Sequence, residues 1–358
     1  MAEQWKSSPA PPRMPSRTLP RPPSVLPRVL VTSSTRREDL APLTGKARLI
    51  MGPGGGDTMP RKEVLRHAQK LSAIICRGEL QIDAELLERA PNLRIVASAS
   101  VGVDKLDLPR MEQRGVFATN APDYFVEATA DYTIGAIISL LRRLPEADRY
   151  VRTGRWRSFQ PGAWDGALLR GKVLGLIGYG AIGRAVARRA EAFGLNVIHY
   201  RRTVSQGSGY TPLPELLARS DIVSLHVPLN DDSRTLINAA RIRRMKRGAY
   251  LINVSRGPVV DEKALISALE SGRLAGAALD VFADEPRVPQ ALRRLPNTLL
   301  TPHLGGGTIE SRRHSSLTCA TAVARVLSGQ RPENLKNNPS DQSLQRWLLP
   351  PGNRITAR

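Results

Sequence analysis

The first third of the chain alternates short apolar runs with stripes of apolar residues at helical spacing. The runs predict buried strands at Val29–Thr32, Arg48–Met51, Ala73–Cys76 and Leu93–Ser98, and the stripes predict helices at Arg61–Leu71 and Asp83–Ala90. Strands that alternate with helices favour a parallel sheet with right-handed connections. The pattern therefore predicts an α/β domain.

The rest of the chain continues this alternation. A stripe formed by Ile134, Ile137, Ile138 and Leu141 predicts a helix over Glu127–Leu144, which Pro145 helps to end. Further strands are predicted at Val173–Ile177, Asn196–Tyr200, Asp221–Val227, Ala249–Val254, Leu274–Val281 and Thr298–Thr301, and further helices at Pro214–Arg219, Asn238–Lys246, Asp261–Ser271 and Thr308–Leu327. This second set predicts a second doubly wound domain with a parallel sheet.

Both ends of the chain are rich in proline. Residues 1–27 are also basic and hold little apolar surface, so we expect a disordered tail there. The prolines argue against the amphipathic helix of an organelle transit peptide. Residues 331–358 are polar, and we expect a C-terminal tail over 336–358.

The chain carries a large excess of arginine. Its formal net charge is +21 and its pI is about 11.0. A nucleic-acid partner would fit this charge, but the arginines are scattered over the predicted helices, and an aromatic content of 4% leaves few platforms on which bases could stack. We therefore expect a basic surface that steers small anions rather than a nucleic-acid site.

Two further features concern the compartment. No apolar run approaches the ~20 residues that span a bilayer, and no secretory apolar segment follows Met1. Cys76 and Cys319 show neither disulfide nor metal-ligand spacing. The sequence thus predicts no metal site and favours a reducing compartment, which we take to be the cytoplasm.

The turn after the strand at 173–177 holds three glycines. Gly178, Gly180 and Gly183 have the spacing G-x-G-x-x-G, with Tyr179, Ala181 and Ile182 between them. Between a strand and a helix, this spacing predicts a dinucleotide site. The first glycine allows a tight turn, the second lets a pyrophosphate approach, and the third lets the helix pack on the strand. The helix N-terminus then offers N–H groups to the phosphates.

The strand at Asn196–Tyr200 is followed by Arg201 and Arg202. An acidic residue near this point would hold the ribose 2′-hydroxyl of NAD. Such an acid would repel a 2′-phosphate, whereas guanidinium groups bind one. The sequence thus favours NADP over NAD, and NAD stays the alternative if these are simply two more arginines of a basic chain.

Three later segments follow predicted strands and carry polar residues. They are Asn253-Val-Ser-Arg256-Gly257, Leu279-Asp280-Val-Phe-Ala-Asp-Glu285-Pro286 and Thr301-Pro-His303-Leu-Gly305. With the glycine loop in front of them, the stretch from about Arg28 to Asn338 resembles the D-isomer-specific 2-hydroxyacid dehydrogenases, in order and without large gaps.

The resemblance implies roles for the matched residues. Arg256 resembles the arginine that binds the substrate carboxylate, His303 the general acid–base, and Glu285 its partner, with Asp284 as a competitor for that place. Asp280 resembles the residue that faces the nicotinamide carboxamide, and Val254 and Ser255 are expected to contact the cofactor. In the loop Ser100-Val-Gly-Val-Asp104, Val101 and Gly102 resemble backbone donors to the substrate carboxylate.

The resemblance also implies a discontinuous architecture. A Rossmann cofactor domain at 121–302 would be inserted in a flavodoxin-like substrate domain made of 28–120 and 303–335, with the site in the cleft between them. Closing the cleft would exclude water from the substrate. A homodimer formed through the cofactor domain is also implied, and the Ile134 stripe would then be interface rather than core.

Within the family, the loop at 100–104 and Tyr200-Arg-Arg are most similar to the glyoxylate and hydroxypyruvate reductases. Two departures leave alternatives open. Gly306 stands where some of these enzymes have a serine, and the segment 151–161 resembles the phosphonate dehydrogenases, which oxidise phosphite. A further alternative is a corepressor scaffold. Such proteins resemble the dehydrogenases and keep the three residues matched here by Arg256, Glu285 and His303, although they prefer NAD.

Overall fold

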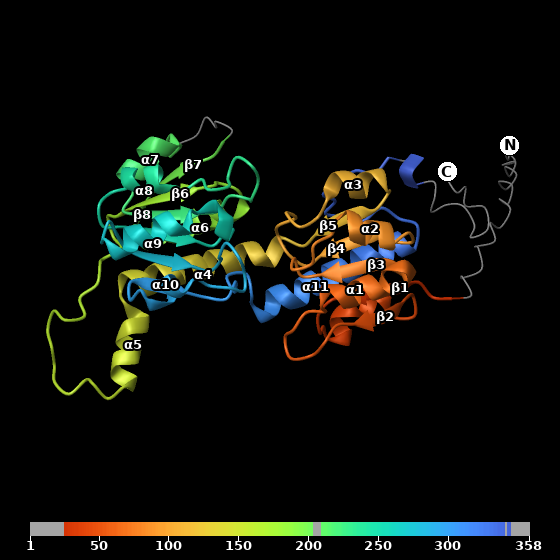
Figure 1. Cartoon of the computed structure of the whole chain (residues 1–358), viewed down its shortest axis with the longest axis horizontal. Coiled ribbons are helices and arrows are strands. Elements are labelled where there is room, and N and C mark those ends of the chain that lie inside the picture. Colours follow the sequence, from red (N-terminus) through yellow and green to blue (C-terminus); the bar gives the residue numbers. More distant parts are fainter. Residues whose placement is uncertain (1–24, 203–208, 341, 345–358) are drawn as a thin grey trace, which may run out of the picture.

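The computed structural model describes residues 25–202, 209–340 and 342–344, which form two lobes (Figure 1). The first lobe is built on five parallel strands: β1 (Arg28–Val31), β2 (Arg48–Met51), β3 (Leu71–Cys76), β4 (Ile95–Ser98) and β5 (Phe117–Asn120). Their order, β2-β1-β3-β4-β5, is that of a flavodoxin-like sheet. The α/β fold class predicted for this lobe is confirmed.

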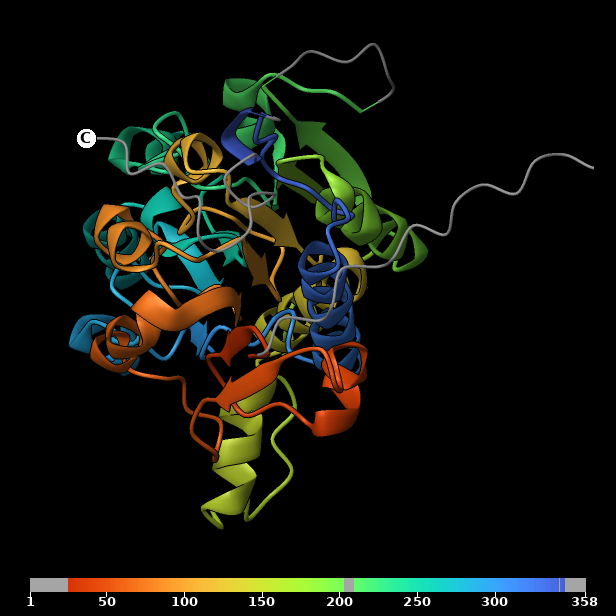
Figure 2. The same ribbon diagram turned by 90° about the vertical axis from the view of Figure 1, so that its right-hand side faces the viewer.

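Apolar side chains point alternately to the two faces of this sheet, and each face has its own cover. One face packs against α1 (Arg61–His67), α2 (Ala84–Arg89) and α3 (Leu108–Gln113). The other packs against the 3-10 helix η1 (Arg37–Leu43) and α11 (Ile309–Leu327), which comes from the far end of the chain. Figure 2, which looks onto this lobe, shows α11 lying along it.

The second lobe is built on six parallel strands: β6 (Val173–Ile177), β7 (Asn196–Tyr200), β8 (Ile222–Leu225), β9 (Ala249–Asn253), β10 (Leu274–Leu279) and β11 (Thr298–Leu300). Their order is β11-β10-β9-β8-β6-β7, and a parallel bridge from His199 to Tyr210 continues the sheet past β7. With that bridge counted as the next strand position, the order is that of a Rossmann sheet.

Two layers of helices cover the second sheet. One face packs against α4 (Asp123–Leu141) and α6 (Ala181–Ala192). The other packs against α7 (Leu213–Arg219), α8 (Ala239–Arg244), α9 (Glu262–Glu270) and α10 (Gln290–Arg294). None of the described helices is long and apolar enough to cross a membrane.

The apolar stripe of α4 lies inside the chain's own core. Ile134, Ile137 and Leu141 are all at most 5% exposed and pack under α6 and the second sheet. The alternative that this stripe is a subunit interface is therefore wrong. The prediction that the helix reaches Leu144 is also wrong, because the chain turns at Arg143 with a left-handed φ of 54°.

Pro145 begins a new helix rather than ending the old one. It stands in the first turn of α5 (Leu144–Arg152), where a missing N–H costs nothing. Helix α5 buries no side chain, and with the loop after it forms an arm that projects from the second lobe in both views (Figures 1 and 2). We call residues 144–170 the arm.

The C-terminal segment packs on the first sheet beyond residue 335, where the tail was predicted to begin. Leu335 bridges Thr119, and the buried amide of Asn337 accepts from the N–H of Ala118 and donates to the carbonyl of Val116, both at 2.8 Å. A tail that starts at 336 is therefore wrong, since these bonds continue the edge of β5. The tail predicted over 1–27 falls almost wholly on residues 1–24, outside the described residues.

Candidate active site

The three glycines of the cofactor loop have three different surroundings. Gly178 has a φ of 100°, and a Cβ on it would lie 2.6 Å from the backbone of His226. A Cβ on Gly183 would overlap the carbonyl oxygen of Gly178, so this glycine lets α6 sit close to the turn. A Cβ on Gly180 would meet nothing within 4 Å, which leaves its outer side open to a ligand. This arrangement fits a pyrophosphate cradle.

A cavity of about 430 Å³ opens in front of that cradle. It is lined by Gly180, Ala181 and Ile182 on one side and by Val254 and Ser255 on another. Among the described residues, no protein acceptor is found for the N–H groups of Ala181 and Ile182 in the first turn of α6. Free N–H groups at a helix N-terminus suit a phosphate. These residues therefore fit a dinucleotide.

The two arginines after β7 differ in their contacts. The Nε of Arg201 is buried and has no hydrogen-bond partner within the described chain, whereas Arg202 forms an ion pair with Asp232. Behind them, the ring of Tyr179 stacks on His199 with the centroids 3.7 Å apart. Burial, and then the charge of Arg201, lower the pKa of His199. Arg201, directly after β7, thus has a buried Nε donor without a partner among the described residues.

His303 follows β11 and faces a second pocket. Its Nδ1 lies 2.8 Å from Oε2 of Glu285, and the other carboxylate oxygen of Glu285 accepts from the N–H of Phe282 at 3.0 Å. Burial raises the pKa of Glu285, but the hydrogen bond and charge of His303 outweigh it and hold the pKa below its usual value. The neighbouring Asp284 pairs with Arg287 instead, at 2.7 Å.

Asp280 holds the loop that carries His303. Its carboxylate is 2% exposed and accepts three hydrogen bonds, from the Thr301 hydroxyl at 2.7 Å, the Leu304 N–H at 2.9 Å and the Gly305 N–H at 2.8 Å. Burial raises the pKa of Asp280, and these donors act against that effect. The geometry thus ties the end of β10 to both sides of His303.

Arg256 stands at the end of a turn shaped by Asn253. The buried Asn253 side chain accepts from the Ser255 N–H at 3.0 Å and donates to the Arg256 carbonyl at 3.1 Å. The guanidinium of Arg256 reaches across to the first lobe, where Nη2 lies 2.8 Å from Oδ1 of Asp104. A Cβ on Gly102 would overlap this Nη2, so a side chain there would displace the guanidinium from its present position.

The loop after β4 presents backbone donors to the same pocket. Asn120 donates to the carbonyl of Val101 at 2.7 Å, and the Ser100 hydroxyl donates to the carbonyl of Gly102 at 2.9 Å. These bonds fix the carbonyl side of the loop. Within the described part of the chain, the N–H groups of Val101 and Gly102 have no acceptor.

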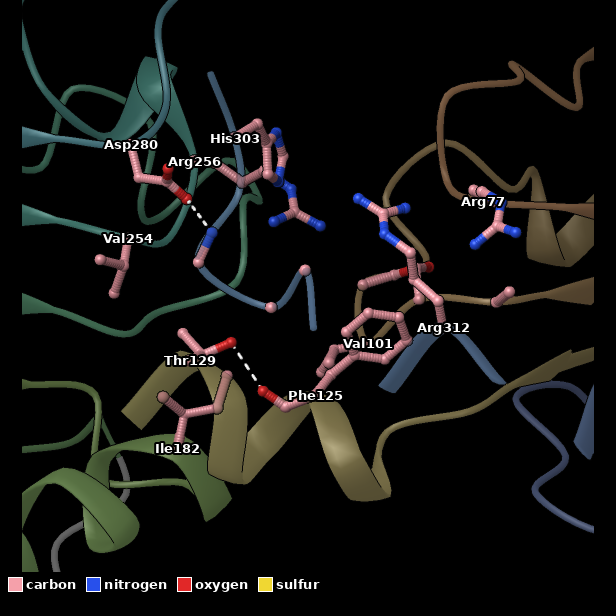
Figure 3. A pocket seen from close by; sticks show the side chains of 16 residues that line it. Arg77, Val101, Phe125, Thr129, Ile182, Val254, Arg256, Asp280, His303 and Arg312 are labelled. Atoms are coloured by element: carbon pink, nitrogen blue, oxygen red, sulfur yellow. Dashed lines mark hydrogen bonds between the residues drawn. The ribbon is translucent and has the colours of Figure 1, made fainter. Parts of the chain in front are cut away.

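One pocket of about 160 Å³ brings these groups together (Figure 3). Its lining includes Val101, Gly102, Arg256, Asp280 and His303, and it adjoins the dinucleotide cavity through shared residues that include Ile182 and Val254. Glu285 lies behind His303 and does not line it. All the strands that lead into the pocket do so at their carboxyl ends, where open α/β sheets bind ligands.

Comparisons with known proteins identify the family of this chain. A family model described as "D-isomer specific 2-hydroxyacid dehydrogenase, NAD binding domain" matches residues 134–305. The glyoxylate reductase of Thermofilum pendens is 42% identical over 286 residues, which cover 77% of this chain and 84% of that enzyme. The chain belongs to this family. The predicted family and its two-sheet α/β fold are confirmed.

Solved structures of similar proteins share the whole fold. An NADPH-dependent glyoxylate/hydroxypyruvate reductase of Sinorhizobium meliloti, in complex with NADP and malonate, is 33% identical with a TM-score of 0.76, covering 86% of this chain and 96% of that one. A D-lactate dehydrogenase of Aquifex aeolicus, in complex with NAD and lactic acid, is 30% identical with a TM-score of 0.77, covering 87% and 100%. These relatives include both nicotinamide cofactors.

Two departures from the dehydrogenase pattern now have a place in the structure. A Cβ on Gly306 would lie 2.7 Å from the Phe125 ring, so Phe125 fills the space that a serine side chain would need. The segment 151–161 lies on the arm and lines neither the pocket nor the dinucleotide cavity. Its resemblance to phosphonate dehydrogenases therefore does not concern the site.

Sequence reasoning missed several residues of this dehydrogenase site. Asn253 and Thr301 stand inside the motifs used to recognise the family, but their positioning bonds show only in three dimensions. Asp104 ends the Ser-Val-Gly-Val-Asp loop, and its partner Arg256 lies 152 residues away. Arg77 and Arg312 also line the pocket, and no local motif marks either of them.

We predict that Asp104→Asn lowers the free energy of unfolding by about 1 kcal/mol at pH 7, because it weakens a partly exposed ion pair between the lobes. Burial raises the pKa of Asp104, but Arg256 lowers it further, so the folded pKa lies below the unfolded value of about 3.9. The stabilisation is therefore complete above that value and is lost as the pH falls through the folded pKa.

Urea titrations of wild type and variant at neutral and acid pH measure this difference. The difference in free energy of unfolding between wild type and variant should be largest at pH 7. It should decrease below about pH 4, where Asp104 begins to take up a proton. A difference that stays constant as the pH falls contradicts the prediction.

Proposed function

We propose that this protein reduces a small 2-keto acid to a D-2-hydroxy acid with a nicotinamide cofactor, as a glyoxylate/hydroxypyruvate-type reductase. One arrangement carries the proposal. The pair of His303 and Glu285, the Arg256 guanidinium and the free N–H groups of Val101 and Gly102 meet at one pocket beside the dinucleotide cavity. The names and cofactors of the relatives support it.

Each of these groups has a role in the reduction. A nicotinamide bound in the dinucleotide cavity would supply hydride to the keto carbon, so negative charge would develop on the keto oxygen. His303 donates the proton to that oxygen while Glu285 holds its Nδ1. Arg256 and the N–H groups of Val101 and Gly102 bind the substrate carboxylate. Arg256 gives up part of its bond to Asp104 when it does so, because both anions use the same guanidinium.

The cofactor half of the site is assigned in the same proposal. The loop 178–183 holds the pyrophosphate, while Val254, Ser255 and Asp280 lie towards the nicotinamide end. Arg201 binds the 2′-phosphate, so NADP is the preferred cofactor, and Arg202 joins it once released from Asp232. The cofactor domain is 121–302 and the substrate domain 28–120 with 303–335, and cleft closure excludes water. A cytoplasmic location agrees with two free, buried cysteines.

We predict that His303→Ala lowers kcat for keto-acid reduction by about 100- to 10,000-fold, because the general acid is lost. Binding of NADPH should persist, since the dinucleotide cavity does not include His303. Absorbance of the nicotinamide measures turnover, and fluorescence titration measures binding. Rapid turnover by the wild type distinguishes an enzyme from a corepressor scaffold, and undiminished turnover by the variant would remove His303 from the mechanism.

We predict that Arg201→Asp weakens NADPH binding by at least about ten- to hundredfold, because charge-assisted bonds to the 2′-phosphate are replaced by repulsion. NADH lacks this phosphate, so the affinity of the variant for NADH should fall only a few-fold. Arg202→Asp is the matched comparison, and its loss of NADPH affinity should be smaller because Arg202 is already paired with Asp232. Equal losses for both cofactors would show that Arg201 does not read the phosphate.

We also propose a homodimer formed through the arm of the cofactor domain. The arm exposes large apolar side chains that a lone chain would leave in water: Leu144, Val151, Trp156, Phe159 and Leu168, with Phe159 84% exposed.

We predict that Phe159→Asp shifts the protein from dimer to monomer in light scattering after size-exclusion chromatography. Ile309→Asp, at an apolar side chain that is 74% exposed outside the arm, should leave the dimer intact. A wild type that is monomeric, or a dimer that survives the arm variant, would contradict this interface.

A further inference from the structure

The pocket extends beyond the catalytic groups to two more guanidiniums. Arg77 follows β3 directly, and Arg312 lies in the first turns of α11, so both belong to the first lobe. In Figure 3 the guanidinium of Arg312 lies between those of Arg256 and Arg77. Among the described residues, Asp280 is the only acid in the lining, and its carboxylate is already held by three donors. The far part of the pocket is therefore cationic.

Arg77 has bonds to neutral groups and a donor to spare. Its Nε donates to the Ser33 hydroxyl at 2.5 Å and its Nη2 to the Thr35 hydroxyl at 3.3 Å. Its Nη1 is buried and has no partner among the described residues. Burial, and then the charge of Arg312, lower the pKa of Arg77. An arginine whose charge is disfavoured by burial and by a second arginine would be stabilised by an anion.

Nearby carboxylates do not take that place. Glu79 accepts from the Thr32 hydroxyl at 2.5 Å and from the backbone N–H of Arg77 at 2.7 Å, on its two oxygens. Asp39 accepts from Arg36 and lies 3.7 Å from Arg313. Within the described chain, neither Arg77 nor Arg312 forms a side-chain ion pair with an acid. Gly307 leaves space for the Arg312 guanidinium. A Cβ on Gly307 would lie 3.1 Å from Nη2 of Arg312.

Glyoxylate would leave these two arginines unused. It consists of a carboxylate and an aldehyde, and Arg256, the 101–102 loop and His303 already bind both groups in the function proposed above. We propose that Arg77 and Arg312 form a subsite for a second anionic group, a carboxylate or a phosphate at the far end of the 2-keto acid. This inference rests on the proposed function and narrows its substrate class.

A purely structural role for Arg77 leads to a different expectation. As a link between β3 and the loop at 33–35, it would affect stability, and its loss would slow all substrates alike. A subsite instead changes the ratio between charged and neutral substrates. Substrate pairs that differ only in the distal group separate the two roles.

The test uses the full chain with NADPH and with NADH. Hydroxypyruvate is compared with its 3-phosphate, and 2-oxobutyrate with 2-oxosuccinate, so that each pair isolates one kind of anion. Glyoxylate serves as the reference substrate. We expect kcat/KM to be higher for at least one anionic member of a pair by about tenfold or more, mainly through a lower KM.

Variants then assign the preference to the two arginines. Arg312→Gln and Arg77→Gln should each reduce the charged-to-neutral ratio by about ten- to hundredfold. Arg313→Gln removes the same charge from the neighbouring position on α11, outside the pocket, and should leave the ratio unchanged. Because the Arg312 side chain lies at the surface, its variant still tests the idea if Arg77→Gln fails to fold.

The two proposals fail in different ways. If glyoxylate is reduced but neither anionic substrate is preferred, or if the arginine variants slow all substrates equally, the subsite is wrong and the reductase stands. If no keto acid is reduced, the proposed function is wrong, and calorimetric titration with the same acids still tests the subsite. In that case equal affinities within each pair would overturn it. The phosphate and carboxylate pairs identify which anion the subsite takes.

Discussion

The buried carboxylate of Asp280 is the contact on which the site depends. An acid at 2% exposure is stable in this position only because the Thr301 hydroxyl and the N–H groups of Leu304 and Gly305 bind it. Those three donors surround His303, which holds an unusual positive φ of 52°. The same loop leads into α11, which covers the first sheet. One anion therefore fixes the orientation of His303 and the return of the chain to the first lobe.

The pocket is cationic because the acids near it are already bound to other groups. Glu285 is bound to His303, Asp280 to its loop and Asp104 to Arg256, so each nearby carboxylate already has a partner. In the proposed mechanism, a substrate carboxylate would compete with Asp104 for the Arg256 guanidinium, and this competition would couple substrate binding to the contact between the lobes. Among the described residues, the N–H groups of Val101 and Gly102 have no acceptor, so they remain available to an incoming anion.

Local patterns in the sequence were enough to predict the sheets, the glycine loop and the three motifs at the strand ends. A strand or a G-x-G-x-x-G turn is defined by neighbours within a few residues, so its physical cause is visible in the chain. The pair of Asp104 and Arg256 joins residues on different lobes, and Arg77 meets Arg312 only because α11 packs beside β3. The predicted end of the first long helix was wrong because Pro145 suits the first turn of a helix as well as a helix end. Asn337 lies in a polar, proline-rich stretch whose burial depends on the open edge of β5.

Missing side chains shape the pocket as much as those that are present. Gly102 lets Arg256 reach Asp104, since any Cβ there would overlap the guanidinium. Gly306 makes room for the Phe125 ring, which then closes one wall with an apolar surface instead of a hydroxyl. The guanidiniums of Arg312 and Arg77 line the same pocket as the Phe125 ring. Gly306, the Phe125 ring and the two arginines thus belong to one arrangement, and its excess of cationic groups would suit the substrate with two anionic groups proposed above.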